Sequence, residues 1–174
     1  AQELDIDCGA SDSQFFTPDR LADVIQRYVH APYYTGVLDY SETSISNVEL
    51  EERNDGYLKV WQHLDFDKKP PTDRRYVIGC DIATGSGSSY TVFSVFDCKT
   101  HEKVAEFASN TMTQVDAAEV AVALGRFYKG SWNKEAYLIW EANGPGGLFG
   151  RKVLEYKYSN IYYHTEEKSI SKKQ

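Results

Sequence analysis

Two continuously apolar runs stand out in the second half of the chain, at 76–80 and 136–140. Unbroken apolar runs are typical of strands that are buried on both faces of a sheet. Three further runs of strand-like composition surround them, bounded by turn residues. The predicted strands therefore cover residues 76–82, 90–97, 103–109, 136–140 and 160–164.

Helical spacing separates the later strands. Asp116 with Glu119 three residues on predicts a capping box at the start of one helix. A second helix is predicted to start near Pro145. The apolar positions of the two helices are Val120, Ala121, Leu124, Phe127 and Tyr128, then Leu148, Phe149, Val153 and Tyr156. Three strands joined by tight turns, followed by alternating helix and strand, predict an α/β fold with a mixed sheet.

The first half has a different pattern. Thr17 is a candidate cap with Pro18 at the first helical position, before an apolar stripe at helical spacing. Its members are Leu21, Val24, Ile25, Tyr28 and Val29. Residues 48–53 and 57–64 then flank Asn54-Asp55-Gly56, which predicts a short peripheral hairpin.

A polar, proline-stiffened stretch at 67–73 has the composition of a boundary. The charge balance also changes there. Residues 1–73 carry 6 Lys or Arg and 15 Asp or Glu, whereas residues 74–174 carry 13 Lys or Arg and 11 Asp or Glu. We therefore predict two parts, 1–73 and 74–174. The chain begins at Ala1 rather than Met, and we interpret it as a piece of a larger protein.

Composition excludes little about function. A net charge of −7 does not suggest a surface coated for nucleic acid, but the local field near a site decides binding, so DNA is neither supported nor excluded. Cys8, Cys80 and Cys98 lack CxxC spacing, which argues against a disulfide framework or a zinc site and favours a reducing cytoplasm. No apolar stretch approaches 18 residues, and no GxxxxGK phosphate loop for ATP is present.

Two carboxylates form the candidate chemistry. Asp81 and Glu141 each follow an apolar strand and precede a glycine-rich turn, at 83–87 and 143–147. If the strands are neighbours, the two side chains face one another and offer the oxygen ligands that Mg²⁺ prefers. With two ions, Asp81 would bridge both, and Glu141 would complete the coordination shell of one of them. The alternative is that each acid is a turn former or a helix cap.

These motifs carry a resemblance to a known family. Segments 77–85 (VIGCDIATG) and 139–146 (IWEANGPG) resemble the two acidic motifs in the nuclease domain of phage terminase large subunits, the DNA-packaging motor proteins. Residues 1–7 with Phe15 and Phe16 resemble the segment that leaves the motor ATPase domain, and 55–61 resembles the linker hairpin before the nuclease. The resemblance covers nearly the whole chain.

The resemblance implies an RNase H-like fold and a metal-dependent endonuclease that cuts concatemeric viral DNA during genome packaging. Asp81 and Glu141 would be its metal-binding and catalytic residues, with Mg²⁺ or Mn²⁺ at a two-ion site. It implies double-stranded DNA, the motor ATPase domain, the portal and the small terminase subunit as partners, in the bacterial host cytoplasm. Residues 1–73 would be the tail of the ATPase domain with a linker subdomain.

Two departures from the family pattern bear on activity. Ser89 stands before Tyr90 where the family often has an Asp. The family's third acidic ligand lies on a helix beyond the fifth strand, which this sequence does not reach, so we expect a C-terminally incomplete nuclease domain. Glu166 and Glu167 are better interpreted as solvated charges than as substitutes.

Other interpretations remain open. Residues 81–85 also resemble the phosphate-binding hairpin of sugar kinases and actin, although the second Asp-x-Gly motif of that group is not visible. A catalytically incomplete docking fragment is the non-enzymatic alternative. Arg151, Lys152 and Lys157, with three lysines further on, could hold a DNA backbone or form a solvated face.

Overall fold

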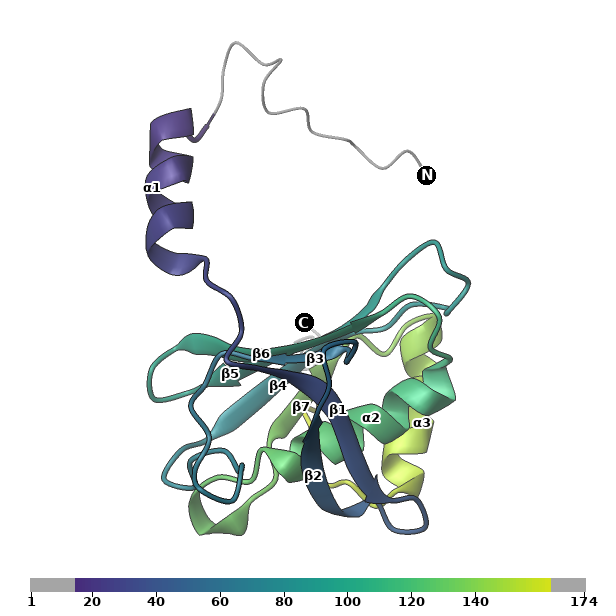
Figure 1. Cartoon of the computed structure of the whole chain (residues 1–174). Coiled ribbons are helices and arrows are strands. Elements are labelled where there is room, and N and C mark those ends of the chain that lie inside the picture. Colours follow the sequence, from purple (N-terminus) through teal and green to yellow (C-terminus); the bar gives the residue numbers. More distant parts are fainter. Residues whose placement is uncertain (1–14, 164–174) are drawn as a thin grey trace, which may run out of the picture. The chain divides into compact units, whose positions relative to one another are not determined.

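One seven-stranded mixed sheet organises most of the chain, in the strand order β2-β1-β3-β6-β5-β4-β7 (Figure 1). A computed structural model describes residues 15–163. The strands are β1 (Tyr34–Ser41), β2 (Ser46–Glu52), β3 (Leu58–Val60), β4 (Tyr76–Asp81), β5 (Thr91–Asp97), β6 (Glu102–Ser109) and β7 (Tyr137–Trp140). The helices are α1 (Pro18–Tyr28), α2 (Gln114–Phe127) and α3 (Pro145–Glu155), with a short 3-10 turn at Ser131–Asn133.

The second half follows the predicted pattern closely. β4, β5 and β6 are consecutive antiparallel strands, and β7 returns parallel to β4 after α2. The predicted mixed α/β sheet of three antiparallel strands followed by alternating helix and strand is therefore confirmed. The predicted strand at 160–164 is reduced to a parallel bridge of Ile161 to Leu138, and His164 lies outside the described residues.

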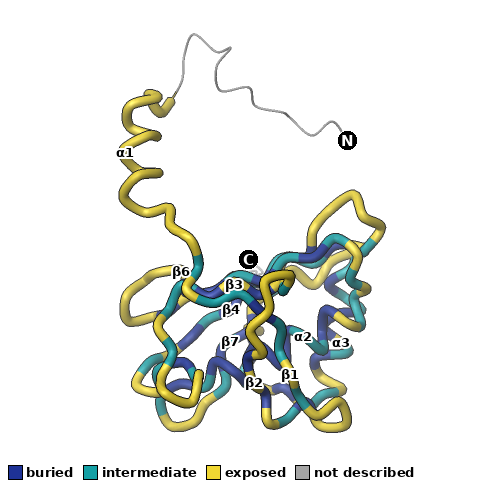
Figure 2. Tube along the Cα trace, viewed as in Figure 1, coloured by how far each residue is buried: buried dark blue, intermediate teal, exposed yellow. Residues whose placement is uncertain are grey.

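α2 and α3 pack side by side on one face of the sheet (Figure 1). Between them and the strands lies the apolar core, seen as dark blue segments in Figure 2. Phe149 of α3 packs against Phe93 of β5 and against Trp140 at the end of β7, with ring centroids 6.2 and 5.5 Å apart. Because strand residues alternate between the two faces of a sheet, every second strand side chain points to the face that α2 and α3 do not cover.

The N-cap of α2 differs from the prediction. Thr113 is the cap residue, and its Oγ1 accepts a hydrogen bond from the Asp116 backbone amide while its hydroxyl donates to the Asp116 carboxylate. The helix thus begins at Gln114, and Asp116 is its third residue rather than the cap. The reciprocal arrangement satisfies one orphan amide of the first turn.

The predicted hairpin of residues 48–53 with 57–64 is wrong. β2 pairs antiparallel with β1, and β3 pairs with β1 on one side and with β6 on the other. Asp55-Gly56 therefore connects two strands that are separated in the sheet by β1. β3 is not peripheral, since its three residues join the two halves of the sheet.

The boundary predicted near Arg74 falls between β3 and β4. Strands on both sides of Arg74 belong to the same sheet, and the chain forms two compact units, residues 1–31 and 32–174. α1 is the helix of the first unit, starts at Pro18 as predicted, and has no buried residue (Figure 2). Among the described residues, no helix combines the length and apolar character needed to span a membrane.

Candidate active site

Asp81 and Glu141 stand at the same end of two neighbouring strands. β4 and β7 are parallel, in a register that pairs Gly79 with Ile139 and Cys80 with Trp140. Asp81 is the last residue of β4, and Glu141 comes directly after β7, so the two acids occupy the next positions of that register. The expectation that their strands are neighbours is confirmed. Carboxyl ends of adjacent parallel strands are where α/β sheets form ligand sites.

Alternation along β4 places Asp81 on the face away from the helices. Tyr76, Ile78 and Cys80 are buried, whereas Asp81 is exposed and lies on the same side as Gly79. A Cβ atom added to Gly79 would meet no atom within 4 Å, so the surface beside Asp81 is open. Burial raises the pKa of the neighbouring Cys80 thiol and so favours its neutral form.

Local geometry explains the glycines that follow Glu141. Gly144 has a φ of 46°, and a side chain at Gly146 would overlap the Glu141 carbonyl. The first turn of α3 can therefore pack against the end of β7 only when positions 144 and 146 are glycine. The Glu141 carboxylate accepts a hydrogen bond from Asn143 Nδ2 at 2.7 Å, which orients it within the same turn.

The loop after Asp81 is fastened to the start of α2. The Ala83 amide donates to Thr91 Oγ1 at 3.0 Å, and the Ala83 carbonyl accepts from Gln114 Nε2 at 3.0 Å. Further along, Gly87 and Asn110 are joined by two hydrogen bonds, of 2.9 and 3.2 Å. These contacts hold the backbone that follows the acid. Local sequence patterns do not indicate these roles of Thr91 and Gln114, because the partner residue lies 8 and 31 residues away.

Both acids are exposed. Neither Asp81 nor Glu141 forms an ion pair within residues 15–163. In that range there is also no group of three His, Cys, Asp or Glu side chains placed to hold a metal ion. The donor set that the structure describes is therefore a pair of carboxylates with available oxygens.

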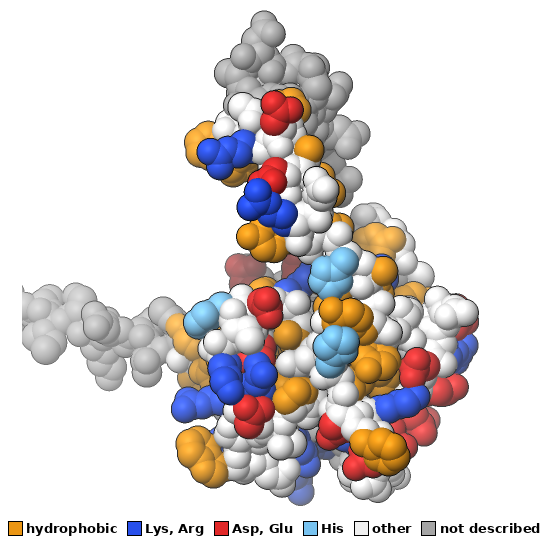
Figure 3. All heavy atoms as spheres, turned by 60° about the vertical axis from the view of Figure 1, so that its left-hand side comes forward, with side chains coloured by type: hydrophobic (Ala, Val, Ile, Leu, Met, Phe, Trp, Pro, Cys, Tyr) orange, Lys and Arg blue, Asp and Glu red, His pale blue; other side chains and the backbone are white. Residues whose placement is uncertain are grey.

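The remaining candidate residues are scattered. Arg151 is exposed on α3, Lys152 is ion-paired to Glu155 at 2.5 Å, and Lys157 is exposed with a φ of 59°. Ser89 and Tyr90 are exposed in the loop after Asp81, and Glu166 and Glu167 lie outside the described residues. On the sheet-containing unit, basic and acidic side chains are intermixed on the face drawn in Figure 3.

Comparisons with known proteins find similarity in structure but not in sequence. No family model and no curated protein matches the chain. A cobalt-bound large terminase nuclease of the thermophilic phage G20c aligns over 81% of this chain and 63% of its own, with 20% identity and a TM-score of 0.50. The chain has the fold of a terminase nuclease domain.

Two further solved structures belong to the same group of nuclease domains. The zinc-bound G20c large terminase nuclease is 23% identical over 74% of this chain and 59% of its own, with a TM-score of 0.48. The Thermus phage P74-26 large terminase nuclease domain is 20% identical over 78% and 56%, with a TM-score of 0.44. The chain thus spans about three fifths of the length of the terminase nuclease domains first matched, and the predicted RNase H-like fold agrees with this likeness.

Proposed function

We propose that the chain is the nuclease portion of a phage large terminase, which cuts concatemeric DNA with a divalent cation held by Asp81 and Glu141. The observation that carries the proposal is the parallel register of β4 and β7, which sets the two carboxylates at adjacent strand ends. The fold likeness to a terminase nuclease supports it. Three solved structures of the G20c large terminase nuclease contain zinc, cobalt and magnesium.

The donor set fits such a cation. Mg²⁺ and Mn²⁺ take oxygen ligands, and one or two carboxylates plus substrate phosphates suffice for Mg²⁺. The carboxylates of Asp81 and Glu141 are exposed and unpaired by cations within the described chain, so their oxygens are available. When bound there, one or two ions would activate the attacking water and stabilise the leaving oxygen of a phosphodiester.

Neighbouring residues of the chain hold the two acids in position. Asn143 orients the Glu141 carboxylate, and the hydrogen bonds of Ala83 to Thr91 and Gln114 hold the backbone beside Asp81. The bare surface at Gly79 leaves space for a bulky phosphodiester backbone to approach the two acids. A rigid strand-end platform of this kind keeps the ligand groups in position without the substrate.

The proposal includes the context that the resemblance implies. Double-stranded DNA would be the substrate, and the motor ATPase domain, portal and small terminase subunit the partners, in the host cytoplasm during virus assembly. Residues 1–73, which contain α1, β1, β2 and β3, would be the tail of the ATPase domain with its linker subdomain. Arg151 and Lys157 would contribute contacts to the DNA backbone.

The test combines metal binding with cleavage. Mn²⁺ binding is measured by calorimetry, and nicking of supercoiled plasmid is measured with Mn²⁺, with Mg²⁺ and with EDTA. The variants are Asp81→Asn and Glu141→Gln, which keep side-chain shape and remove charge. Asp39→Asn, an exposed acid of β1, is the matched control.

We expect each site variant to lower Mn²⁺ affinity and nicking at least about 100-fold, because even outer-shell partners of metal ligands contribute about 10- to 100-fold. EDTA should abolish nicking, and Asp39→Asn should behave as the unmodified chain. Binding that is equal in Asp81→Asn and the unmodified chain would contradict the proposed site. Metal binding without any cleavage would instead favour the interpretation as a catalytically incomplete docking fragment.

A further inference from the structure

A pocket of about 280 Å³ opens at the other end of β4 and β7. It is formed where β4 and β7 begin and β5 ends, whereas Asp81 and Glu141 stand where β4 and β7 end. Its lining includes Arg75, Cys98, Trp132 and Lys134. Its volume lies near the lower bound of pockets that take small ligands.

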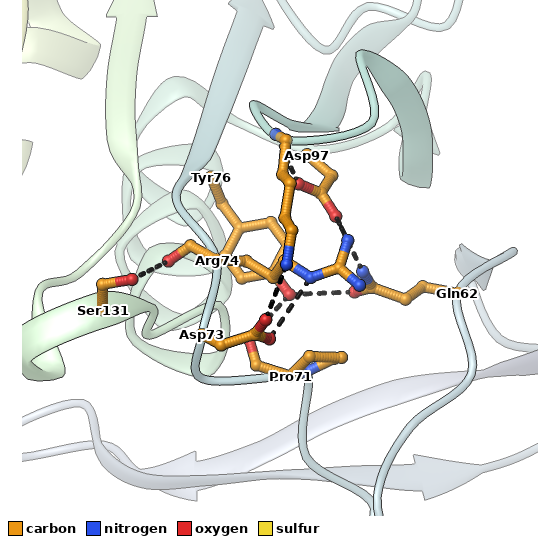
Figure 4. A network of polar contacts seen from close by, with 8 residues as sticks. Gln62, Pro71, Asp73, Arg74, Tyr76, Asp97 and Ser131 are labelled. Atoms are coloured by element: carbon orange, nitrogen blue, oxygen red, sulfur yellow. Dashed lines mark hydrogen bonds and ion pairs between the residues drawn. The ribbon is translucent and has the colours of Figure 1, made fainter.

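The loop that carries Trp132 is fixed to the start of β4. The Ser131 amide and hydroxyl both donate to the Arg74 carbonyl, at 2.6 and 3.1 Å, and the hydroxyl contact is drawn in Figure 4. The Gly130 amide donates to the Lys134 carbonyl at 2.9 Å, and a side chain at Gly130 would overlap the Arg74 carbonyl. The Gly130–Lys134 hydrogen bond thus closes the loop, and the Ser131 hydrogen bonds hold it against the Arg74 carbonyl.

This fixed loop holds Trp132 in a strained and exposed position. Trp132 and Asn133 have φ angles of 58° and 56°, in the left-handed region that bulky residues avoid. The Trp132 side chain is nonetheless 80% exposed, so core packing does not explain its conformation. Strain of this kind persists where the surroundings impose it, and it gathers at ligand sites.

The pocket has a surplus of positive charge. Of its three cations, Arg74 is neutralised, because it contacts the buried Asp97 at 2.7 Å and Asp73 at 3.2 Å (Figure 4). The carboxylate of Glu135, which also lines the pocket, is bound by Arg126 at 3.1 Å. Arg75 and Lys134 form no ion pair within residues 15–163, and the Arg75 guanidinium lies 5.8 Å from the Trp132 ring centroid.

We propose that this pocket binds one nucleotide, with its base stacked on Trp132 and its phosphate held by Arg75 and Lys134. An exposed aromatic ring beside two available cations matches a ligand that is flat at one end and anionic at the other. The nucleotide is either free or an unpaired unit of a DNA strand, since the two share this chemistry. A base inside an intact duplex is excluded because both of its faces are already stacked. The inference does not depend on the nuclease proposal.

The experiment titrates the chain with dAMP in the presence of EDTA, which removes any contribution of a metal site. Binding is followed by quenching of tryptophan fluorescence and by protection of Cys98, an exposed residue of the pocket, from alkylation mapped by mass spectrometry. The variants are Trp132→Gly, which suits the positive φ, Arg75→Gln and Lys134→Gln. Lys59→Gln, an exposed lysine of β3, is the matched control.

We expect saturable quenching with a Kd of about 1 mM and slower alkylation of Cys98. Trp132→Gly should abolish the stacking signal and protection of Cys98, and each cation variant should weaken binding about tenfold. Lys59→Gln should bind as the unmodified chain. Tighter binding of a short single-stranded oligonucleotide than of dAMP would assign the site to DNA, and equal or weaker binding would assign it to free nucleotides.

Three results would overturn the inference. The first is the absence of saturation, and the second is binding that Arg75→Gln and Lys134→Gln leave unchanged. The third is inorganic phosphate binding as tightly as dAMP, which would leave an anion site without base recognition. Thermal unfolding of every variant separates these results from misfolding, and the exposed positions of Trp132, Arg75 and Lys134 predict midpoints no lower than that of the unmodified chain.

Discussion

Replacement by alanine should have opposite effects on stability at two helical glycines, Gly125 and Gly147. Gly125 of α2 faces the ring of Tyr158, whose hydroxyl donates to the Ala136 carbonyl at 2.5 Å, and a Cβ atom there would overlap that hydroxyl. Gly147 of α3 has only the Ala142 carbonyl nearby, at an ordinary 3.4 Å from an added Cβ. The first glycine is required by packing, and the second is not.

We therefore predict that Gly125→Ala destabilises the fold by about 1–2 kcal/mol, because overpacking of about 1–3 kcal/mol exceeds the gain in helix propensity. Gly147→Ala should stabilise it by up to about 1 kcal/mol. Urea unfolding of both variants measures the two changes. A stabilising Gly125→Ala would show that the Tyr158 ring moves away without cost.

At the residue scale, the sequence alone predicted the strand-end positions of Asp81 and Glu141, because each acid terminates an unmistakable apolar run. It missed Thr113 as the cap of α2, although Thr113 with Asp116 fits a capping box as well as Asp116 with Glu119 does. Both patterns are local, and only the packing of α2 on the sheet decides between them. Whether the two acids bind metal stays a prediction.

Arg126 connects elements that are distant in sequence. It donates to the carbonyls of Ser44 and Ile45 in the turn between β1 and β2, at 2.5 and 2.9 Å. It also donates to the Tyr156 carbonyl after α3 at 3.1 Å and to Glu135 at 3.1 Å. One half-buried guanidinium therefore joins α2, the β1–β2 turn, the end of α3 and the segment before β7.

Arg126→Ala should destabilise the fold by about 2–4 kcal/mol, because it leaves three carbonyls and a carboxylate without their donor. Arg126→Lys should recover only part of this, since one ammonium cannot reproduce the planar fork. Thermal and urea unfolding measure both losses. Equal stability of Arg126→Ala and the unmodified chain would contradict the role assigned to this residue.

Truncation provides a second test at the element scale. No residue of α1 is buried, and the compact unit of the sheet starts at Pro32. A chain that begins at Pro32 should therefore unfold with a midpoint within about 2 °C of the full chain, as expected for a stability change below about 0.5 kcal/mol. A larger fall in the midpoint would show that residues 1–31 stabilise the sheet.

Element prediction failed where pairing is distant in sequence. β1 was not predicted, because Gly36 and Asp39 interrupt its apolar pattern. The turn at Asp55-Gly56 suggested a local hairpin, yet Gly56 is needed where a side chain would overlap the backbone of Gly36. Nothing in the local pattern of β3 indicates that Leu58 pairs with Phe107. Such long-range choices depend on the whole sheet.

At the scale of the whole molecule, charge constrains how DNA can bind. The net charge is −7, and basic and acidic groups are intermixed on the face shown in Figure 3. Affinity for a polyanion therefore depends on a few unpaired cations. Lys68 and Lys99 are already ion-paired to Glu52 and Asp73, whereas Arg151 is not ion-paired within the described chain.

Each phosphate contact contributes about −0.9 to the slope of log affinity against log salt. The double variant Arg151→Gln/Lys157→Gln should accordingly reduce the magnitude of that slope by about 2 for double-stranded DNA. The control double variant Lys68→Gln/Lys99→Gln should leave the slope unchanged. Fluorescence anisotropy across a salt series with Ca²⁺ measures binding apart from cleavage, and equal slopes in both double variants would remove Arg151 and Lys157 from the interface.

The position of β3 determines when the sheet can form during synthesis. β1 and β2 can pair early as a hairpin, but an isolated hairpin is marginal in water and β3 adds only three residues. The partner of β3 on its other side, β6, is synthesised more than 40 residues later, and the α2 cover later still. The first three of the seven strands therefore keep an unprotected edge until β6 is synthesised, and chaperone binding to the nascent chain should peak before residue 109 emerges from the ribosome.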